Sequence, residues 1–141
     1  MRWVFRYLIF ILLIIVFSCD KITQNVNCDD CTSTEPSQID LKITLDDKSE
    51  ISNSTVVRVY EGLLEDNILH GTYYSNGPDL WVTVFINKKY TLTADYNYRD
   101  GDVYVVVNSA TPRVKYVPDQ CKDPCYIVYD NSVDLRLKYR Y

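Results

Sequence analysis

The residues with the clearest chemical potential in this 141-residue chain are its five cysteines. Four of them form two close pairs, Cys28-x2-Cys31 and Cys121-x3-Cys125. In a small exported domain, an even number of cysteines at short spacings predicts two disulfides. Two other interpretations are open at this point. One is a zinc site with four thiolate ligands, because both spacings are close to those of zinc knuckles. The other is a redox-active Cys-x-x-Cys pair.

Several features favour disulfides over these alternatives. Export to an oxidising compartment, which the N-terminal segment described below predicts, argues against zinc, as does the absence of glycine from both short loops. Asp29 and Asp30 lie between the first two thiols, and their charge disfavours the thiolate that a redox cysteine needs. The four cysteines allow three pairings. We expect bridges from one pair to the other, which close a loop of about ninety residues and stabilise the domain by on the order of 4–5 kcal/mol.

The only histidine, His70, could serve as a general base or a single metal ligand. No nucleophile or ligand cluster is spaced around it, so we expect a turn or strand-edge residue. Serine nucleophile elbows and phosphate-binding glycine loops are absent from the sequence. The sequence therefore predicts no enzyme and no cofactor. A small cell-wall or glycan hydrolase that uses two carboxylates is the alternative.

A short apolar segment near the N-terminus predicts export. Residues 7–17 form an uninterrupted run of 11 apolar residues, which Arg2 and Arg6 precede. A helix that spans the hydrocarbon core needs about 20 such residues, so the run has the length of a signal-peptide core. We therefore expect residues 1–18 to be a signal peptide.

The end of this segment, Val16-Phe17-Ser18-Cys19, resembles the lipobox of bacterial lipoproteins, although Phe17 is bulkier than the usual residue there. The resemblance implies that the chain is cleaved before Cys19, whose acyl chains then hold it in a lipid bilayer. It also implies a place in the cell envelope, at the outer membrane on its periplasmic or surface face. Ordinary secretion after cleavage at Ser18 and an uncleaved anchor are the alternatives.

The charge of the chain makes nucleic acid an unexpected partner. The full sequence has a formal charge of −4, and removal of residues 1–18 takes away two arginines and no acids. Phosphate backbones are bound by clustered Lys and Arg, which an acidic chain of this composition does not supply. The same sign of charge opposes binding to anionic membrane surfaces, so the acyl anchor would hold the protein to its bilayer.

Strand-like periodicity begins after a polar segment. Residues 19–37 are expected to form the lipidated N-terminus and a flexible linker. From residue 38 onward the apolar residues recur with a period of two, which is typical of strands with one buried face. Residues 55–60, 68–74, 113–117 and 126–129 are further expected strands. The clearest alternating runs are Ile39, Leu41, Ile43 and Leu45, and Val133, Leu135, Leu137 and Tyr139.

The middle of the chain predicts a three-stranded meander. We expect residues 80–86 to pair with residues 90–98 across a short loop, so that Val84 faces Leu92. Residues 90–98 should then pair with the next strand across an Asp-Gly turn within residues 99–102, so that Tyr96 faces Val105. Both hairpins place the same side of the middle strand in the core. A one-residue slip would reverse every side chain.

About seven or eight strands, four glycines and no clear helix predict an all-β fold, an antiparallel β-sandwich over residues 38–141. The pattern is similar to that of the immunoglobulin-like and transthyretin-like sandwiches that are common in envelope lipoproteins. This resemblance concerns architecture, and no motif specific to either family supports it.

One sheet face has the composition of a binding surface. Opposite the expected core lie Trp81, Phe85, Asp95 and Tyr104, among threonine and asparagine side chains. Aromatic rings among polar groups are typical of surfaces that stack on sugars or receive a protein. The competing expectation is that another strand or the C-terminal segment covers Trp81 and Phe85.

Together these features predict a membrane-anchored envelope lipoprotein whose β-sandwich is a non-enzymatic binding or structural module. Its partner would be an envelope protein or a glycan. A module that binds a metal or another soluble ligand through the four thiols is a further alternative.

Overall fold

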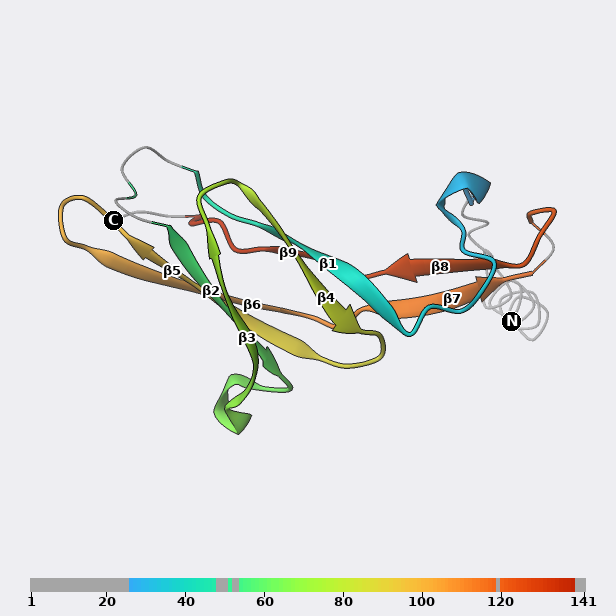
Figure 1. Ribbon diagram of the computed structural model, residues 1–141, viewed down its shortest axis with the longest axis horizontal. Coiled ribbons are helices and arrows are strands. Elements are labelled where there is room, and N and C mark those ends of the chain that lie inside the picture. Colours follow the sequence, from blue (N-terminus) through green and yellow to red (C-terminus); the bar gives the residue numbers. More distant parts are fainter. Residues whose placement is uncertain (1–25, 48–50, 52–53, 119, 139–141) are drawn as a thin grey trace, which may run out of the picture.

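The computed structural model describes residues 26–47, 51, 54–118 and 120–138. The expected signal peptide, Cys19 and Tyr139 lie outside this part of the chain. Within it, no helix is long and apolar enough to cross a membrane. The described residues form two short 3-10 helices, η1 (Cys28–Asp30) and η2 (Leu64–Asp66), and nine strands (Figure 1). The strands are β1 (Gln38–Thr44), β2 (Thr55–Glu61), β3 (Ile68–Ser75), β4 (Asp79–Phe85), β5 (Tyr90–Asn97), β6 (Val103–Ala110), β7 (Arg113–Val117), β8 (Cys125–Tyr129) and β9 (Ser132–Asp134).

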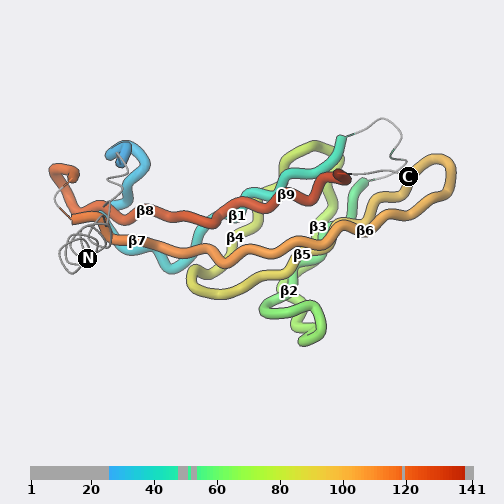
Figure 2. Tube along the Cα trace, turned by 180° about the vertical axis from the view of Figure 1, so that it is seen from behind, coloured from blue at the N-terminus to red at the C-terminus, as the bar shows by residue number. Residues whose placement is uncertain are grey.

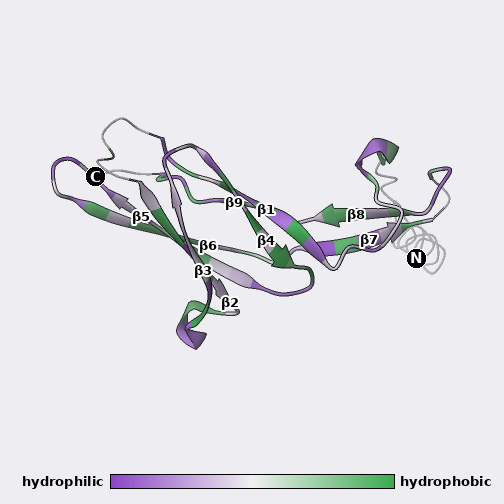
Figure 3. Cartoon of the chain, in the orientation of Figure 1, coloured by the Kyte–Doolittle hydropathy of each residue, from purple (hydrophilic) through white to green (hydrophobic). Residues whose placement is uncertain are grey.

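Seven of these strands form a β-sandwich, which confirms the expected fold class. One sheet has the order β4-β1-β9 and the other the order β3-β2-β5-β6. Neighbouring strands are antiparallel, except that β9 runs parallel to β1. The alternating pattern of β1 decides which of its sides is buried. Leu41 and Ile43 are fully buried, whereas Asp40 and Lys42 are exposed, and Figure 3 shows this alternation along the strand.

The core lies between the two sheets, and both contribute to it. Its members are the inward-facing aliphatic and tyrosine side chains of five of the seven strands, with residues that closely follow three of them. They are Leu41, Ile43, Leu45, Val57, Val59, Val82, Val84, Tyr90, Leu92, Ala94, Tyr96, Tyr98, Val133 and Leu135.

The hydroxyl group of the buried Tyr96 ring forms two hydrogen bonds to the backbone. Its hydroxyl donates a hydrogen bond to the backbone carbonyl of Leu135 at 2.9 Å and accepts one from the backbone N–H of Asp46 at 3.1 Å. The phenol therefore links β5 of one sheet to the segments that follow β1 and β9 of the other. Burial of the ring raises the pKa of Tyr96 to about 12, because the phenolate would lose its hydration.

β7 and β8 form a separate two-stranded ribbon at one end of the sandwich (Figure 1). β7 follows β6 after residues 111–112, and β8 leads into β9 through residues 130–131. The two long arms made in this way run side by side (Figure 2). The ribbon is thus an extension of two sandwich strands beyond the core.

The expected hairpin between residues 80–86 and 90–98 is wrong. β4 pairs with β1, and β5 pairs with β2 and β6, so the two strands belong to opposite sheets. The short connection between them crosses from one sheet to the other, and the N–H of Asn87 donates to Pro112 rather than across a hairpin. The buried sides of both strands were nevertheless predicted correctly, because facing sheets of a sandwich bury the same alternating pattern.

The expected register between β5 and β6 is wrong by one residue. Tyr96 lies opposite Tyr104 and not opposite Val105. The N–H of Tyr98 donates to the carbonyl of Asp102 at 2.9 Å, so the turn holds three residues, and its third residue, a glycine, has a φ of 96°. The slip turns three side chains of β6 outward, and they are 52–61% exposed: Val103, Val105 and Val107.

Candidate functional site

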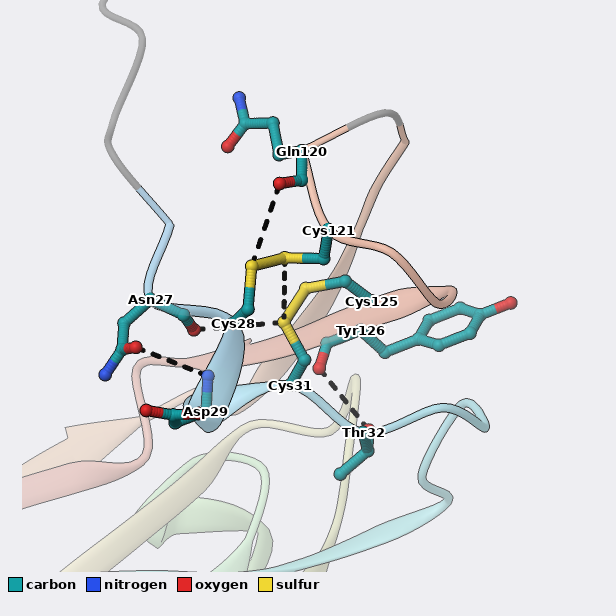
Figure 4. The surroundings of a disulfide bond; sticks show 9 residues. All are labelled: Asn27, Cys28, Asp29, Cys31, Thr32, Gln120, Cys121, Cys125 and Tyr126. Atoms are coloured by element: carbon teal, nitrogen blue, oxygen red, sulfur yellow. Dashed lines mark hydrogen bonds between the residues drawn. A yellow bond between two sulfur atoms is a disulfide. The ribbon is translucent and has the colours of Figure 1, made fainter.

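The four cysteines form two disulfides, as predicted. Cys28 bonds to Cys121 and Cys31 bonds to Cys125, with S–S distances of 2.05 and 2.04 Å (Figure 4). Both bridges join one close pair to the other. The sulfur atoms of Cys31 and Cys121, which belong to different bridges, are 3.8 Å apart. All four sulfurs are therefore in disulfides, and none of them is a free thiolate in this structure.

The bridges tie the N-terminal segment to the tip of the ribbon. The side chain of Asn27 caps η1, and one residue after Cys31 the chain makes a β-bridge to β8. In this bridge Thr32 and Tyr126 exchange two backbone hydrogen bonds of 3.1 and 3.0 Å. Residues 28–32, which the sequence assigned to the linker, are therefore part of the folded body.

The four residues of the expected binding face do not share one surface. Trp81 and Phe85 lie on β4 in one sheet, whereas Asp95 and Tyr104 lie in the opposite sheet on β5 and β6. Asp95 forms an ion pair with Arg58 on the outer side of its sheet. Tyr104 is partly buried against the core, because the register slip described above turns its side chain inward. The expected face assumed that β4 and β5 pair as a hairpin, whereas the two strands belong to opposite sheets.

A smaller surface, here called the aromatic face, remains on the outer side of β4 and β1. Trp81 is 57% exposed and Phe85 is 42% exposed, so neither is covered by another described strand. Their partners on β1 are polar, since Lys42 lies opposite Trp81 and Gln38 opposite Phe85. The aromatic face consists of Trp81, Thr83 and Phe85 on β4 and of Gln38, Asp40 and Lys42 on β1.

Polar contacts fix the side chains around Trp81. The ammonium of Lys42 lies 5.8 Å from the centre of the Trp81 ring and 3.3 Å from a carboxylate oxygen of Asp79. Next to them, the hydroxyl of Thr83 donates a hydrogen bond of 2.8 Å to Asp40. The surface between the two aromatic rings is therefore polar and already ordered by its own hydrogen bond.

A hollow adjoins the aromatic face at Phe85. Its volume is about 560 Å³, and its lining combines apolar, hydroxyl and charged side chains. Lys88 lies 5.3 Å from the centre of the Phe85 ring and 2.9 Å from a carboxylate oxygen of Glu61. This pairing raises the pKa of Lys88 and lowers that of Glu61. The lining residues are Glu35, Pro36, Ser37, Phe85, Ile86 and Lys88.

Two side chains of the opposite sheet, Tyr90 and His70, contact backbone groups of β4. The hydroxyl of Tyr90 accepts a hydrogen bond of 3.0 Å from the N–H of Phe85, and His70 Nε2 lies 3.3 Å from the carbonyl oxygen of Thr83. His70 sits at a β-bulge of the edge strand β3, and its ring meets that of Tyr90 edge-on at 5.5 Å. These contacts occupy backbone groups of an edge strand, which would otherwise be open to pairing. His70 thus has a structural role at a sheet edge.

A second hollow, of about 390 Å³, lies where the ribbon meets the sandwich. Its lining is mostly polar and includes one carboxylate: Ser109, Ala110, Thr111, Arg113, Asp130 and Ser132.

Sequence reasoning identified Trp81 and Phe85 but missed their neighbours Asp40 and Lys42. The signal was present in the alternation of residues 39–45, which assigned both polar residues to an outer face. The alternation does not indicate which strand lies beside residues 39–45, and therefore does not place Asp40 and Lys42 next to Trp81. The chain matches no family model, no curated protein and no solved structure.

Proposed function

We propose that this protein is a membrane-anchored, non-enzymatic binding module of the cell envelope, and that its aromatic face is the binding surface. The observation that carries the proposal is the exposure of Trp81, a large ring held open to solvent on an ordered strand. An exposed aromatic side chain beside fixed polar groups is typical of recognition surfaces. The partner is an envelope protein or a glycan.

The composition of the two hollows favours binding over hydrolysis. Among the described residues, the lining of each hollow contains one carboxylate, Glu35 in one and Asp130 in the other. Hydrolysis of a glycoside uses a facing pair of carboxyl groups about 5–10 Å apart. The hydrolase alternative therefore has no support from these hollows.

The disulfides determine which part of the folded body lies closest to the proposed anchor. Eight residues separate Cys19 from Cys28, and a fully extended chain of this length spans at most about 30 Å. The ribbon tip would thus stay within about 30 Å of the bilayer, with the sandwich attached to it at the other end of the ribbon. This arrangement suits a protein of the outer membrane that meets its partner in the adjoining space.

The strand order favours one of the two expected sandwich architectures, the immunoglobulin-like and the transthyretin-like, over the other. In immunoglobulin domains the first strand pairs with the second. Here β1 pairs with β4 and β9, and β2 pairs with β3 and β5. We therefore favour the transthyretin-like architecture of the two.

Replacement of Trp81 tests the binding surface. We expect Trp81→Ala to lose capture of the envelope component that the wild-type mature chain retains, measured by pull-down from solubilised envelopes with purified glycans in a parallel arm. The matched control is Tyr74→Ala, which removes a ring that is 69% exposed on the opposite sheet. Equal capture by wild type and Trp81→Ala would contradict the aromatic face.

A second experiment tests the anchor. We expect Cys19→Ala to abolish incorporation of radiolabelled palmitate, because the variant lacks the thiol that would carry the anchoring acyl chain. Cys28→Ala is the control, since that cysteine lies in a disulfide. Continued labelling of the Cys19→Ala variant would exclude this cysteine as the anchor.

A further inference from the structure

We infer that the aromatic face binds an uncharged oligosaccharide chain that lies along β4, from Trp81 across Thr83 to the hollow beside Phe85. The inference rests on the proposed binding function and names the class of its ligand.

The spacing of the two rings suits a chain of sugars. Trp81 and Phe85 are four residues apart on one strand, so their side chains leave the same side of the sheet about 13 Å apart. That distance requires a ligand several sugar units long. Each pyranose ring has an apolar C–H face that stacks on an aromatic ring and a rim of hydroxyl groups that needs polar partners. The aromatic face provides both kinds of partner along one line, because the Thr83 hydroxyl and the Asp40 carboxylate lie between the two aromatic rings.

The dimensions of the face favour a narrow ligand over a folded protein. β1 and β4 have seven residues each and β9 has three. Seven residues extend about 23 Å, and three neighbouring strands are about 14 Å wide, which gives at most roughly 300 Å² of sheet surface. A stable protein–protein interface buries about 800 Å² of accessible surface on each partner, so a protein partner would have to contact residues beyond this flat area. A single polysaccharide chain needs no more width than two strands provide.

The charges on the face favour an uncharged chain. Lys42 is paired with Asp79, and Lys88 is paired with Glu61. Among the described residues that form the aromatic face or line the hollow, the other charged groups are carboxylates, Asp40 on β1 and Glu35 in the hollow. An acidic polysaccharide would meet these carboxylates without an unpaired cation to offset them, whereas sugar hydroxyl groups can donate hydrogen bonds to both.

The test uses the full chain, purified in detergent, and titrates it with chitohexaose, cellohexaose and xylohexaose as uncharged probes. Polygalacturonate is the acidic probe, and binding is measured by isothermal titration calorimetry. At least one uncharged hexasaccharide should bind, and Trp81→Ala should weaken its association constant about ten-fold or more, as expected for the loss of a stacked ring. Phe85→Ala should weaken it several-fold, and Trp81→Phe, which keeps a ring, less than Trp81→Ala. Tyr74→Ala should leave it unchanged.

Three results would overturn the inference. They are the failure of all three uncharged probes to bind, tighter binding of polygalacturonate than of any of them, and binding that Trp81→Ala leaves intact. If the sugars fail while an envelope protein is still captured through Trp81, the proposed binding function stands and the choice of ligand is wrong. The variants change exposed side chains, and their thermal unfolding should match that of the wild type.

Discussion

Removal of both disulfides is expected to lower the free energy of unfolding by about 7 kcal/mol, whereas removal of either one alone lowers it by only about 2–3 kcal/mol. The comparison is between the quadruple Cys→Ala variant and the two double variants, Cys28→Ala/Cys121→Ala and Cys31→Ala/Cys125→Ala. The stability of a whole domain is about 5–15 kcal/mol, so the loss of both bridges removes about half of it or more.

The inequality follows from the topology of the two bridges. They join residues 93 and 94 positions apart, so either bridge alone closes almost the same long loop. In the chain-entropy model the first bridge contributes about 4–5 kcal/mol, and the second then closes a ring of only about eight residues, which contributes about 2–3 kcal/mol. Either bridge alone therefore provides most of the stabilisation that comes from closing the long loop.

Urea unfolding followed by tryptophan fluorescence measures these differences. The control is a variant on the exposed surface, Tyr74→Ala, which should change stability by less than about 0.5 kcal/mol. Additive losses from the two double variants would contradict the shared loop. A quadruple variant as stable as the wild type would mean that the bridges contribute nothing to the folded state.

Replacement of Tyr96 by Phe is expected to cost about 3 kcal/mol although only one oxygen atom is removed. The substitution leaves the carbonyl of Leu135 and the N–H of Asp46 without the hydroxyl that bonds to both, and a buried polar group that loses its partner costs about 1–3 kcal/mol. Tyr104→Phe is the matched control, because its hydroxyl bonds to Asp102 at the exposed edge of the sheet. Urea unfolding at neutral pH should separate the two variants, and equal losses would contradict the role of Tyr96.

The same residue predicts a loss of stability at high pH. The pKa of Tyr96 is raised in the folded state to about 12, above its ordinary value of about 10. The folded protein therefore holds the phenolic proton more tightly than the unfolded chain, and this stabilisation is present below pH 10 and is lost as the pH rises toward about 12. The loss amounts to about 2–3 kcal/mol.

Tyr96→Phe isolates this contribution from that of the other tyrosines. The difference in unfolding free energy between wild type and variant should shrink between pH 8 and about pH 11, because only the wild type carries the buried phenol. A difference that stays constant over this range would show that Tyr96 does not titrate with a raised pKa.

Much of the local structure was predictable from the sequence. Each strand of the structure corresponds to an expected run, and the sides of β1, β4 and β5 that face the core were assigned correctly. These assignments depend on alternation within one strand, which hydrophobic burial decides residue by residue. The inter-pair disulfides were also expected, although geometry alone could choose among the three pairings.

The candidate site was only partly predictable. Trp81 and Phe85 were placed correctly on an outer face, but Asp95 and Tyr104 were assigned to the same surface and lie in the other sheet. Two errors combined to produce this result. A short connection was taken for a hairpin although it crosses between sheets, and a three-residue turn shifted β6 by one position.

The sequence by itself determined where the strands lie, which residues of most strands are buried and which cysteines are close in the chain. Only the tertiary structure decided which strands are neighbours, and therefore that Asp40 and Lys42 flank Trp81 while Asp95 does not. The physical reason is that burial of alternate side chains is a local property of each strand. Strand pairing depends instead on backbone hydrogen bonds between distant segments, and many partners satisfy the same alternation equally well.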